Sequence, residues 1–252
     1  MIKIENTEVM GLEAAIRGMR NPVNSWGKSD SQCLYHMFEN WERGKDPELD
    51  KKYDDLLDNW GLNLQIGPND HDLMMRLAAG GPVHAKYRRM IVVYCDITAP
   101  LYWWKEFDTY KIGTVANSCS TMHKIHEKEF TLDDFSCEDL GVTIPAELND
   151  GEEVYQNLWE ECFKDIIKHL NLARDSFNRE TNPELKKKYW RVMIQYLPSS
   201  YNQKRTVMLN YEVLTGIYPM RKNHKLDEWC EFCKWIESLP YSEIIIGEEK
   251  EK

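Results

Sequence analysis

Several features that would assign the chain to a protein class are missing from its sequence. No apolar run approaches the roughly 18 residues that a membrane-spanning helix needs, and the N-terminal residues lack the charged start and apolar block of a secretion signal. We therefore expect a cytoplasmic protein that does not associate with membranes. The net charge of −10 argues against general nucleic-acid binding, although it is compatible with a local basic pocket.

Common motifs for catalysis and nucleotide binding are missing as well. The chain has no Gly-rich phosphate loop, no Gly-x-Ser-x-Gly and no His-Glu-x-x-His, which argues against the nucleotide sites, hydrolases and zinc proteases built on them. Its seven cysteines are odd in number and scattered, a pattern typical of reduced thiols rather than a disulfide framework. The lone pair Cys230 and Cys233 has no second pair, so we predict two half-buried thiols and no metal site.

The residues that are present favour a globular protein with an aromatic interior. Apolar residues make up 42% of the 252 positions, enough to bury one sizeable core. Nine tryptophans and thirteen tyrosines are many for this length, so aromatic packing should dominate the interior or an interface. We predict one domain over residues 1–247 and a disordered charged tail at residues 248–252.

Hydrophobic periodicity predicts mostly helices with a few strands. The run at residues 90–94 is rich in β-branched residues and is expected to form a strand buried on both faces. A shorter strand is expected at residues 2–4. Helices are predicted to begin near residues 7 and 100 and to cover residues 70–79, 152–180, 184–195, 204–217 and 226–238.

Three polar clusters are candidates for chemistry. The first lies just before the strand at 90–94, where Lys86, Arg88 and Arg89 follow His84 closely. Guanidinium and ammonium groups in this density can hold phosphate or another anion. The same pattern is typical of a solvated strand entrance, and composition alone leaves both interpretations open.

The second cluster follows the aromatic helix that begins near residue 100. It contains Gly113, Asn117, Ser118 and Ser120, small polar residues that let a ligand approach the backbone and can also simply cap a helix end.

The third cluster contains Arg205, Asn210, Arg221 and His224. Guanidinium groups suit a phosphate monoester, although surface arginines on helices are the more common outcome.

Taken in order, these segments resemble the flavin-dependent thymidylate synthases over most of the chain. That family also opens with a strand and a helix, and has a His-containing turn before a strand, here with His84. Its Pro-led aromatic helix, followed by Arg-His-Arg, seven residues and a Ser, is similar to the segment from Pro100 to Met122. The family's C-terminal Leu-Pro, Asn, Leu-Arg, His and Trp resemble Leu197-Pro198, Asn210, Met220-Arg221, His224 and Trp229.

The resemblance implies an α+β fold, mostly helical with a small antiparallel sheet. It also implies a homotetramer whose sites form between subunits. In that family FAD accepts a hydride from NADPH, and methylenetetrahydrofolate donates the carbon that converts dUMP to dTMP. Asn210 would then lie at the flavin, Arg221 at the pyrimidine nucleotide, and His84 beside the turn that binds the flavin.

Several positions depart from the family's pattern. Arg-His-Arg reads Thr109-Tyr110-Lys111, and the family's Ser reads Cys119, followed by Ser120. The next Arg of the family reads Thr121. The family's Gln that holds the nucleotide is replaced by Glu106. The family's Arg before Leu-Pro is replaced by Ile194, with Arg191 nearly one helical turn earlier. At the turn that binds the flavin, the family's Thr and Glu are replaced by Lys86 and Arg89. Cations are thus lost in one segment and gained in another, which favours relocated charge over a decayed pocket.

Our first hypothesis is a thymidylate-synthase-like enzyme, or a nucleotide-binding homo-oligomer, acting on a dUMP-type pyrimidine nucleotide with flavin. The predicted residues are Arg221, Lys111 and Arg191 for phosphate, Glu106 and Asn117 for the base, and Lys86, Arg89, His84 and Asn210 for the cofactor or a second anion. Cys119, with Ser120 beside it, is a candidate nucleophile because a thiol can add to a pyrimidine ring; a buried small residue is the alternative.

Two further hypotheses stay open. Lost catalytic residues beside a polar cleft are typical of a non-catalytic protein of the same fold that sequesters a nucleotide or regulates through it. An interaction protein could use the aromatic run Tyr102, Trp103 and Trp104, although core packing explains these residues more simply.

Overall fold

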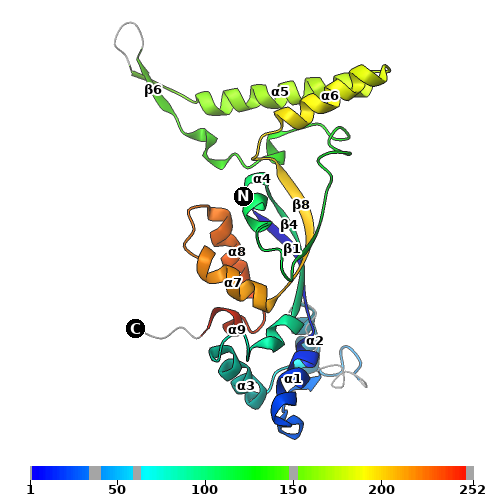
Figure 1. The fold of residues 1–252 in the computed structure, drawn as a ribbon, viewed down its shortest axis with the longest axis vertical. Helices are drawn as coiled ribbons and strands as arrows, with labels where there is room; N and C mark the ends of the chain where they lie inside the picture. The colour runs from blue at the N-terminus through cyan, green and yellow to red at the C-terminus, as the bar shows by residue number, and fades with distance from the viewer. Residues whose placement is uncertain (1, 34–40, 59–63, 148–152, 248–252) are drawn as a thin grey trace. The chain divides into compact units, whose positions relative to one another are not determined.

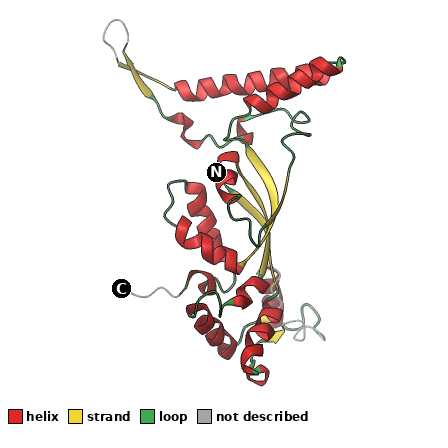
Figure 2. Ribbon diagram, viewed as in Figure 1, coloured by secondary structure: helices red, strands yellow, loops and turns green. Residues whose placement is uncertain are grey.

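The computed structural model describes residues 2–33, 41–58, 64–147 and 153–247, and within them the fold is α+β as predicted (Figures 1 and 2). The main sheet has the strand order β1-β4-β8-β5, with β1 at Lys3–Met10, β4 at Val92–Pro100, β8 at Asn202–Asn210 and β5 at Val115–Ser118. Two antiparallel pairs join β2 (Gln32–Cys33) to β3 (Leu64–Gln65) and β6 (Ile144–Glu147) to β7 (Glu153–Gln156). The predicted tail at residues 248–252 lies outside the described residues.

Helices account for most of the remaining ordered structure. Their bounds are α1 Leu12–Arg20, α2 Pro47–Asp58, α3 Pro68–Ala79, α4 Leu101–Phe107, α5 Leu158–Arg179, α6 Pro183–Tyr196, α7 Tyr211–Arg221, α8 Asp227–Ser238 and α9 Glu243–Ile246, with a short 3-10 turn, η4, at Lys86–Met90. Among the described residues, none of these helices is both long and apolar enough to cross a membrane.

The chain packs as two compact units. The first unit contains Met1–Lys3, Thr98–Asp108 and Ser118–Arg205, and the second contains Ile4–Ile97, Thr109–Asn117 and Thr206–Lys252. Strands β4 and β8 therefore each begin in one unit and end in the other.

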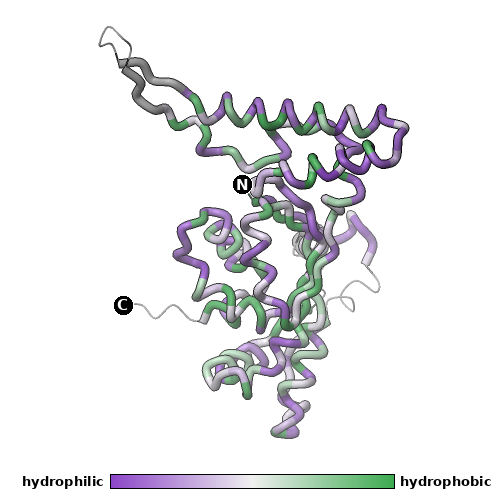
Figure 3. Tube along the Cα trace, turned by 45° about the horizontal axis from the view of Figure 1, so that its top comes forward, coloured by the Kyte–Doolittle hydropathy of each residue, from purple (hydrophilic) through white to green (hydrophobic). Residues whose placement is uncertain are grey.

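The first unit is built on the helical hairpin of α5 and α6. Asn182 begins α6 by accepting hydrogen bonds from the backbone N–H groups of Glu184 (3.0 Å) and Leu185 (3.2 Å), and Pro183 occupies the first helical position. Apolar and polar positions alternate along α5 with helical spacing (Figure 3). The buried side chains that form this core are Ile125, Phe130, Phe135, Phe163, Ile167, Leu170, Ala173 and Met193.

Helix α4 adds an aromatic core to the first unit. Trp103 and Trp104 are fully buried, with ring centroids 4.9 Å apart, and Phe107 packs on both. The indole N–H of Trp104 donates to the carbonyl of Gln203 at 2.9 Å. These tryptophans therefore serve the interior and are not available as an exposed protein interface.

In the second unit, α1 packs on η4, and α7 packs on η4, α8 and α9. Gly11, which precedes α1, has a φ of +91°, and a β-carbon there would lie 2.1 Å from the carbonyl oxygen of Met90. Only glycine fits this position, and it ends β1 before α1 begins. Helix α8 buries Trp229, Phe232, Trp235 and Ile236 against the rest of the unit.

The structure corrects four predicted elements. The strand predicted at residues 90–94 is β4, which runs from Val92 to Pro100, and it is not buried on both faces, because its buried positions alternate with partly exposed ones such as Tyr94. Residues 202–210 form strand β8, whereas a helix was predicted from residue 204, and α7 begins only at Tyr211. Residues 153–156 form β7, because pairing with β6 takes them out of the predicted long helix, which begins at Leu158 after its cap Asn157. Strand β1 continues to Met10, so the first helix begins at Leu12 and not near residue 7.

Candidate functional site

A polar cluster of the second unit surrounds Arg221, the last residue of α7. Its Nε donates to the phenol oxygen of Tyr110 at 2.9 Å, and its guanidinium carbon lies 4.4 Å from the ring centroid of Trp229 and 5.6 Å from that of Tyr110. Trp229 is fully buried, whereas Arg221, Tyr110 and His224 are half-buried. The aromatic rings therefore fix the guanidinium at the edge of the unit while leaving it partly accessible. We call these four residues the Arg221 cluster.

His224 completes the Arg221 cluster, and its hydrogen bonds indicate its tautomer. The backbone N–H of Leu226 donates to Nδ1 of His224 at 3.1 Å, so in the neutral ring the proton lies on Nε2. That nitrogen lies 3.0 Å from Nη1 of Arg221, which can only donate. The two groups lie close enough together for one acceptor atom of a ligand, such as a carbonyl or phosphate oxygen, to contact both.

The loop at Thr109–Asn117 runs along α7 in the opposite direction to the helix. Tyr110 contacts Arg221 at the end of α7, and Gly113 lies against Asn210 at its start. A β-carbon on Gly113, whose φ is +79°, would lie 3.2 Å from Nδ2 of Asn210 and 3.0 Å from a methyl of Val213. The helix is about 16 Å long, so Asn210 and Arg221 lie at opposite ends of one continuous strip of loop and helix.

Asn210, predicted to bind the cofactor, caps α7. Its Oδ1 accepts from the backbone N–H of Val213 at 3.1 Å, a contact that fixes the side chain. The amide Nδ2 stays on the side of Gly113. The Oδ1 atom of Asn210 thus has a structural role as a helix cap, whereas Nδ2 is a donor that a ligand could use.

The basic turn η4 combines exposed and buried cations. Lys86 and Arg89 are exposed, as is His84 just before the turn. Arg88 is buried, and its Nη1 lies 3.9 Å from Oε2 of Glu212 on α7. One cation therefore fixes the turn against α7 and two face outward, and anion binding by this segment stays a prediction.

Burial governs the other polar group of this turn. The phenol of Tyr87 donates to the carbonyl of Met74 at 2.8 Å, and burial raises the pKa of Tyr87 to about 12. Tyr87 therefore anchors η4 to α3 as a neutral donor.

In the first unit, Cys119 and Ser120 line a cavity of about 280 Å³ whose walls include Ile125, Phe130 and Tyr201. Cys119 is an exposed free thiol, not the buried small residue considered as its alternative. Its backbone N–H donates to Lys204 at 2.9 Å, and its carbonyl accepts from the Gln203 amide at 2.7 Å. Its backbone is thus fixed while the residue is exposed.

Ser120 has a local structural role. Its hydroxyl oxygen accepts from the backbone N–H groups of Met122 (3.2 Å) and His123 (2.9 Å), which closes the turn after β5. This geometry provides a turn-closing acceptor, and among the described contacts it brings no base to the hydroxyl.

The remaining predicted residues are distributed over both units. Lys111 and Asn117 are exposed in the second unit, on the loop beside α7 and on β5. Glu106 is half-buried on α4 and Arg191 is exposed on α6, both in the first unit.

Two members of the Arg221 cluster, Tyr110 and Trp229, appeared in the sequence only as positions compared with a known family. His224 was named with Arg221 in the third polar cluster, but no role in the site was predicted for it. The spacing of Arg221 and His224, three residues apart after a helix, was the available signal, but only the fold brings Tyr110 to them across 111 positions.

The arrangement of helices and strands has the fold of the flavin-dependent thymidylate synthases. A crystal structure of thymidylate synthase X from Helicobacter pylori with FAD and dUMP superposes with a TM-score of 0.55 at 13% identity, covering 99% of this chain and 98% of that one. A second structure of that enzyme, also with FAD and dUMP, gives 0.56 at 15% identity, covering 99% and 100%.

A UMP/dUMP methylase from Streptomyces cacaoi, bound to 5-bromo-dUMP, has a TM-score of 0.52 at 12% identity and covers 97% of this chain and 94% of that one. In sequence, no protein-family model and no curated protein matches the chain. The likeness therefore concerns the fold.

Proposed function

We propose that this protein binds a pyrimidine nucleotide of the dUMP type at the Arg221 cluster and acts on it as a flavin-dependent, thymidylate-synthase-like methyl or one-carbon transferase. The observation that carries the proposal is the half-buried guanidinium of Arg221, whose Nη1 lies 3.0 Å from Nε2 of His224 and which is held beside the rings of Tyr110 and Trp229. The fold supports it, because the three structures named above contain dUMP or a dUMP analogue.

The chemistry of the Arg221 cluster suits such a ligand. A pyrimidine nucleotide offers carbonyl and phosphate oxygens that accept from paired donors, and a planar base that packs on aromatic rings. Fixing a guanidinium between two rings before binding reduces the conformational entropy lost on binding. Lys111, next to Tyr110, would add a flexible cation for the phosphate, and Asn117 on the same loop would add an amide for the base.

The second unit also has residues that fit FAD. Lys86 and Arg89 are exposed cations on one short turn, a donor set suited to a pyrophosphate, and Nδ2 of Asn210 is a fixed amide donor beside Gly113. When bound, FAD supplies hydride transfer. The role of His84, Lys86, Arg89 and Asn210 would be to bind and orient it.

The proposed reaction needs NADPH as hydride source and methylenetetrahydrofolate as carbon donor. We propose that the protein is a homotetramer. In the first unit, Glu106 and Arg191 are proposed as nucleotide-binding residues, and Cys119 and Ser120 as catalytic residues. Cys119 is exposed as a nucleophile must be, whereas the hydroxyl of Ser120 serves its turn.

The alternative is a non-catalytic protein of this fold that binds a nucleotide to sequester it or to regulate through it. The closure of the turn by Ser120 favours this alternative, because it leaves one of the two proposed catalytic side chains with a structural role.

Titration calorimetry with dUMP tests the nucleotide site. We expect wild-type protein to bind dUMP, and Arg221→Ala to bind at least about tenfold more weakly, because a charge-assisted hydrogen bond to an oxyanion is lost. Lys225→Ala is the matched control, since this exposed cation lies four residues further along the chain. Equal affinities in all three proteins would place the nucleotide elsewhere, and no binding by wild type would overturn the proposal.

A further inference from the structure

A second cavity, in the second unit and separate from the Arg221 cluster, lies between the end of α1 and the first turns of α3. Its volume is about 470 Å³. The polar and charged residues that line it are Arg20, Ser25, Lys28, Asn69, Asp72 and Arg76. Three of these are cations and one is an acid, and Asp72 already pairs with Arg76 at 2.9 Å.

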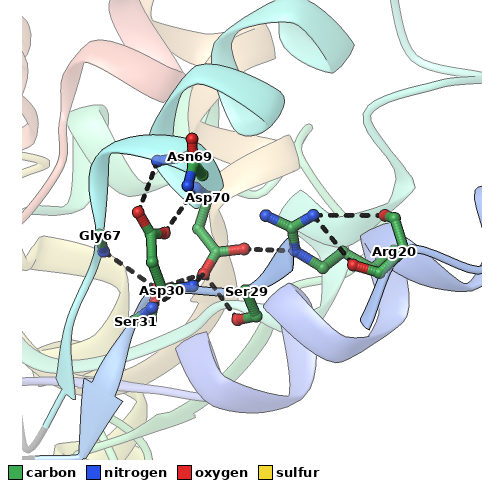
Figure 4. Close-up of polar contacts among 8 residues, drawn as sticks. Arg20, Ser29, Asp30, Ser31, Gly67, Asn69 and Asp70 are labelled. Atoms are coloured by element: carbon green, nitrogen blue, oxygen red, sulfur yellow. Dashed lines mark hydrogen bonds and ion pairs between the residues drawn. The ribbon is translucent and has the colours of Figure 1, made fainter. Parts of the chain in front are cut away.

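Next to this cavity, the carboxylate of Asp70 is saturated with hydrogen bonds (Figure 4). Asp70 is fully buried on α3. Its Oδ2 accepts from the hydroxyls of Ser29 and Ser31, both at 2.7 Å, and from the backbone N–H groups of Asp30 and Ser31, both at 3.1 Å. Its Oδ1 accepts from Nε of Arg20 at 2.6 Å. These bonds fix both the carboxylate and the guanidinium in place.

The guanidinium of Arg20 is not saturated in the same way. Its side chain is 4% exposed, and Nη1 donates to the carbonyl and the hydroxyl of Ser25, both at 3.2 Å. The third nitrogen, Nη2, has no hydrogen-bond partner among the described residues, and Figure 4 shows it without a dashed line. A buried charged donor without an acceptor is unfavourable, so an oxygen of a ligand or of a water that reached Nη2 would stabilise it.

We propose that this cavity binds an oxyanion of the phosphate type, recognised by Arg20 together with Lys28 and Asn69. A planar guanidinium already fixed by Asp70 and Ser25 is oriented before binding, and Lys28 is an exposed ammonium whose flexible stem reaches into the solvent side of the cavity. The ligand is either free inorganic phosphate or a phosphate group of a larger molecule. The cavity is distinct from the proposed nucleotide site, so the two proposals stand or fall separately.

Thermal unfolding of the full chain in inorganic phosphate tests the site, with sodium chloride at equal ionic strength as reference. Phosphate should raise the Tm of wild type above that reference, since a ligand that binds only the folded state stabilises it. In Lys28→Glu, the phosphate concentration that gives half of the maximal rise in Tm should be about tenfold higher than in wild type. Lys51→Glu on α2 is the matched control and should respond as wild type does.

Arg20→Lys tests the buried cation. It keeps the charge beside Asp70 but removes the planar donor set, so a folded variant should lose the phosphate response. If this variant fails to fold, the comparison of Lys28→Glu with Lys51→Glu still decides. Equal phosphate responses in those two variants, or no response in wild type beyond that to chloride, would overturn the proposal.

The source of the phosphate is decided by competition. In this experiment dUMP and FAD are each titrated into protein that is saturated with inorganic phosphate. A weakened affinity for one of them, removed by Lys28→Glu, would identify the phosphate group of that molecule as the ligand. Unchanged affinities for both, with the phosphate response intact, would identify free phosphate.

Discussion

At the scale of single residues, Asp70 has the clearest structural role. Burial alone would raise its pKa, but hydrogen bonds from Ser31, Ser29 and Arg20 outweigh burial, so its pKa lies below the usual 3.8. The folded chain therefore holds the proton less tightly than the unfolded chain does. The stability that Asp70 contributes is complete above pH 3.8 and is lost as the pH falls through and below that value.

Replacing Asp70 with Asn tests this account. At neutral pH we expect Asp70→Asn to lower the free energy of unfolding by about 3 kcal/mol, because the buried Arg20 loses its counter-charge. Below pH 3.8 the difference from wild type should shrink, since the unfolded wild-type chain then binds a proton at Asp70 that the folded carboxylate, with its lowered pKa, still resists. Urea unfolding at pH 7 and at pH 3 measures both values. An equal difference at the two pH values would contradict a charge-based role.

Gly113 sets the path of the loop beside α7. Gly113→Ala would introduce a β-carbon at a positive φ and close to Asn210 and Val213. We expect a loss of about 1–2 kcal/mol in the free energy of unfolding. dUMP affinity should fall as well, because Tyr110 lies three residues away on the same loop. Gly81→Ala, also at a positive φ but with open space around it, is the control and should leave dUMP binding unchanged.

At the scale of elements, local sequence predicted some boundaries well and others poorly. The helix from residue 184 was predicted within one residue of α6, because Asn182 and Pro183 form a strong local start signal. Strand β8 was predicted as a helix, because its pairing with β4 and β5 comes from residues more than 80 positions earlier. In the structure, the buried side chains of β8 are Gln203, Val207 and Leu209, and the positions between them are exposed or half-buried, as is typical of a strand.

In the candidate site, too, some residues could be predicted from the local sequence, whereas contacts between distant residues could not. Arg221, Asn210 and the basic turn could be identified from spacing and residue type. The contact of Tyr110 with Arg221 and the link between Arg20 and Asp70, 50 positions apart, depend on tertiary packing. No periodic pattern in the sequence encodes such pairs.

The start of α6 provides a test at the scale of a helix. Asn182→Ala removes an acceptor for two backbone N–H groups, so we expect a loss of about 1 kcal/mol in the free energy of unfolding. Lys187→Ala, an exposed change on the same helix, should cost less than about 0.5 kcal/mol. Urea unfolding measures both, and equal losses would contradict the capping role.

At the scale of the whole molecule, the helical hairpin of α5 and α6 has large apolar side chains that are exposed in the described part of the chain. Leu172 on α5 is 64% exposed and Val192 on α6 is 45% exposed. We expect them to be covered by other copies in the proposed homotetramer. Light scattering after size exclusion should show the tetramer for wild type and Lys168→Glu, and a smaller species for Leu172→Glu. A monomeric wild type would contradict this arrangement.

The central claim is that one chain of this fold binds both a flavin and a pyrimidine nucleotide. The most direct measurement is the visible absorbance spectrum of freshly purified protein, repeated after adding FAD with and without dUMP. We predict a protein-bound flavin band that shifts when dUMP is added to wild type and does not shift in Arg221→Ala. A colourless protein whose spectrum with FAD equals that of free FAD would contradict the flavoenzyme account and leave the non-catalytic nucleotide-binding protein in its place.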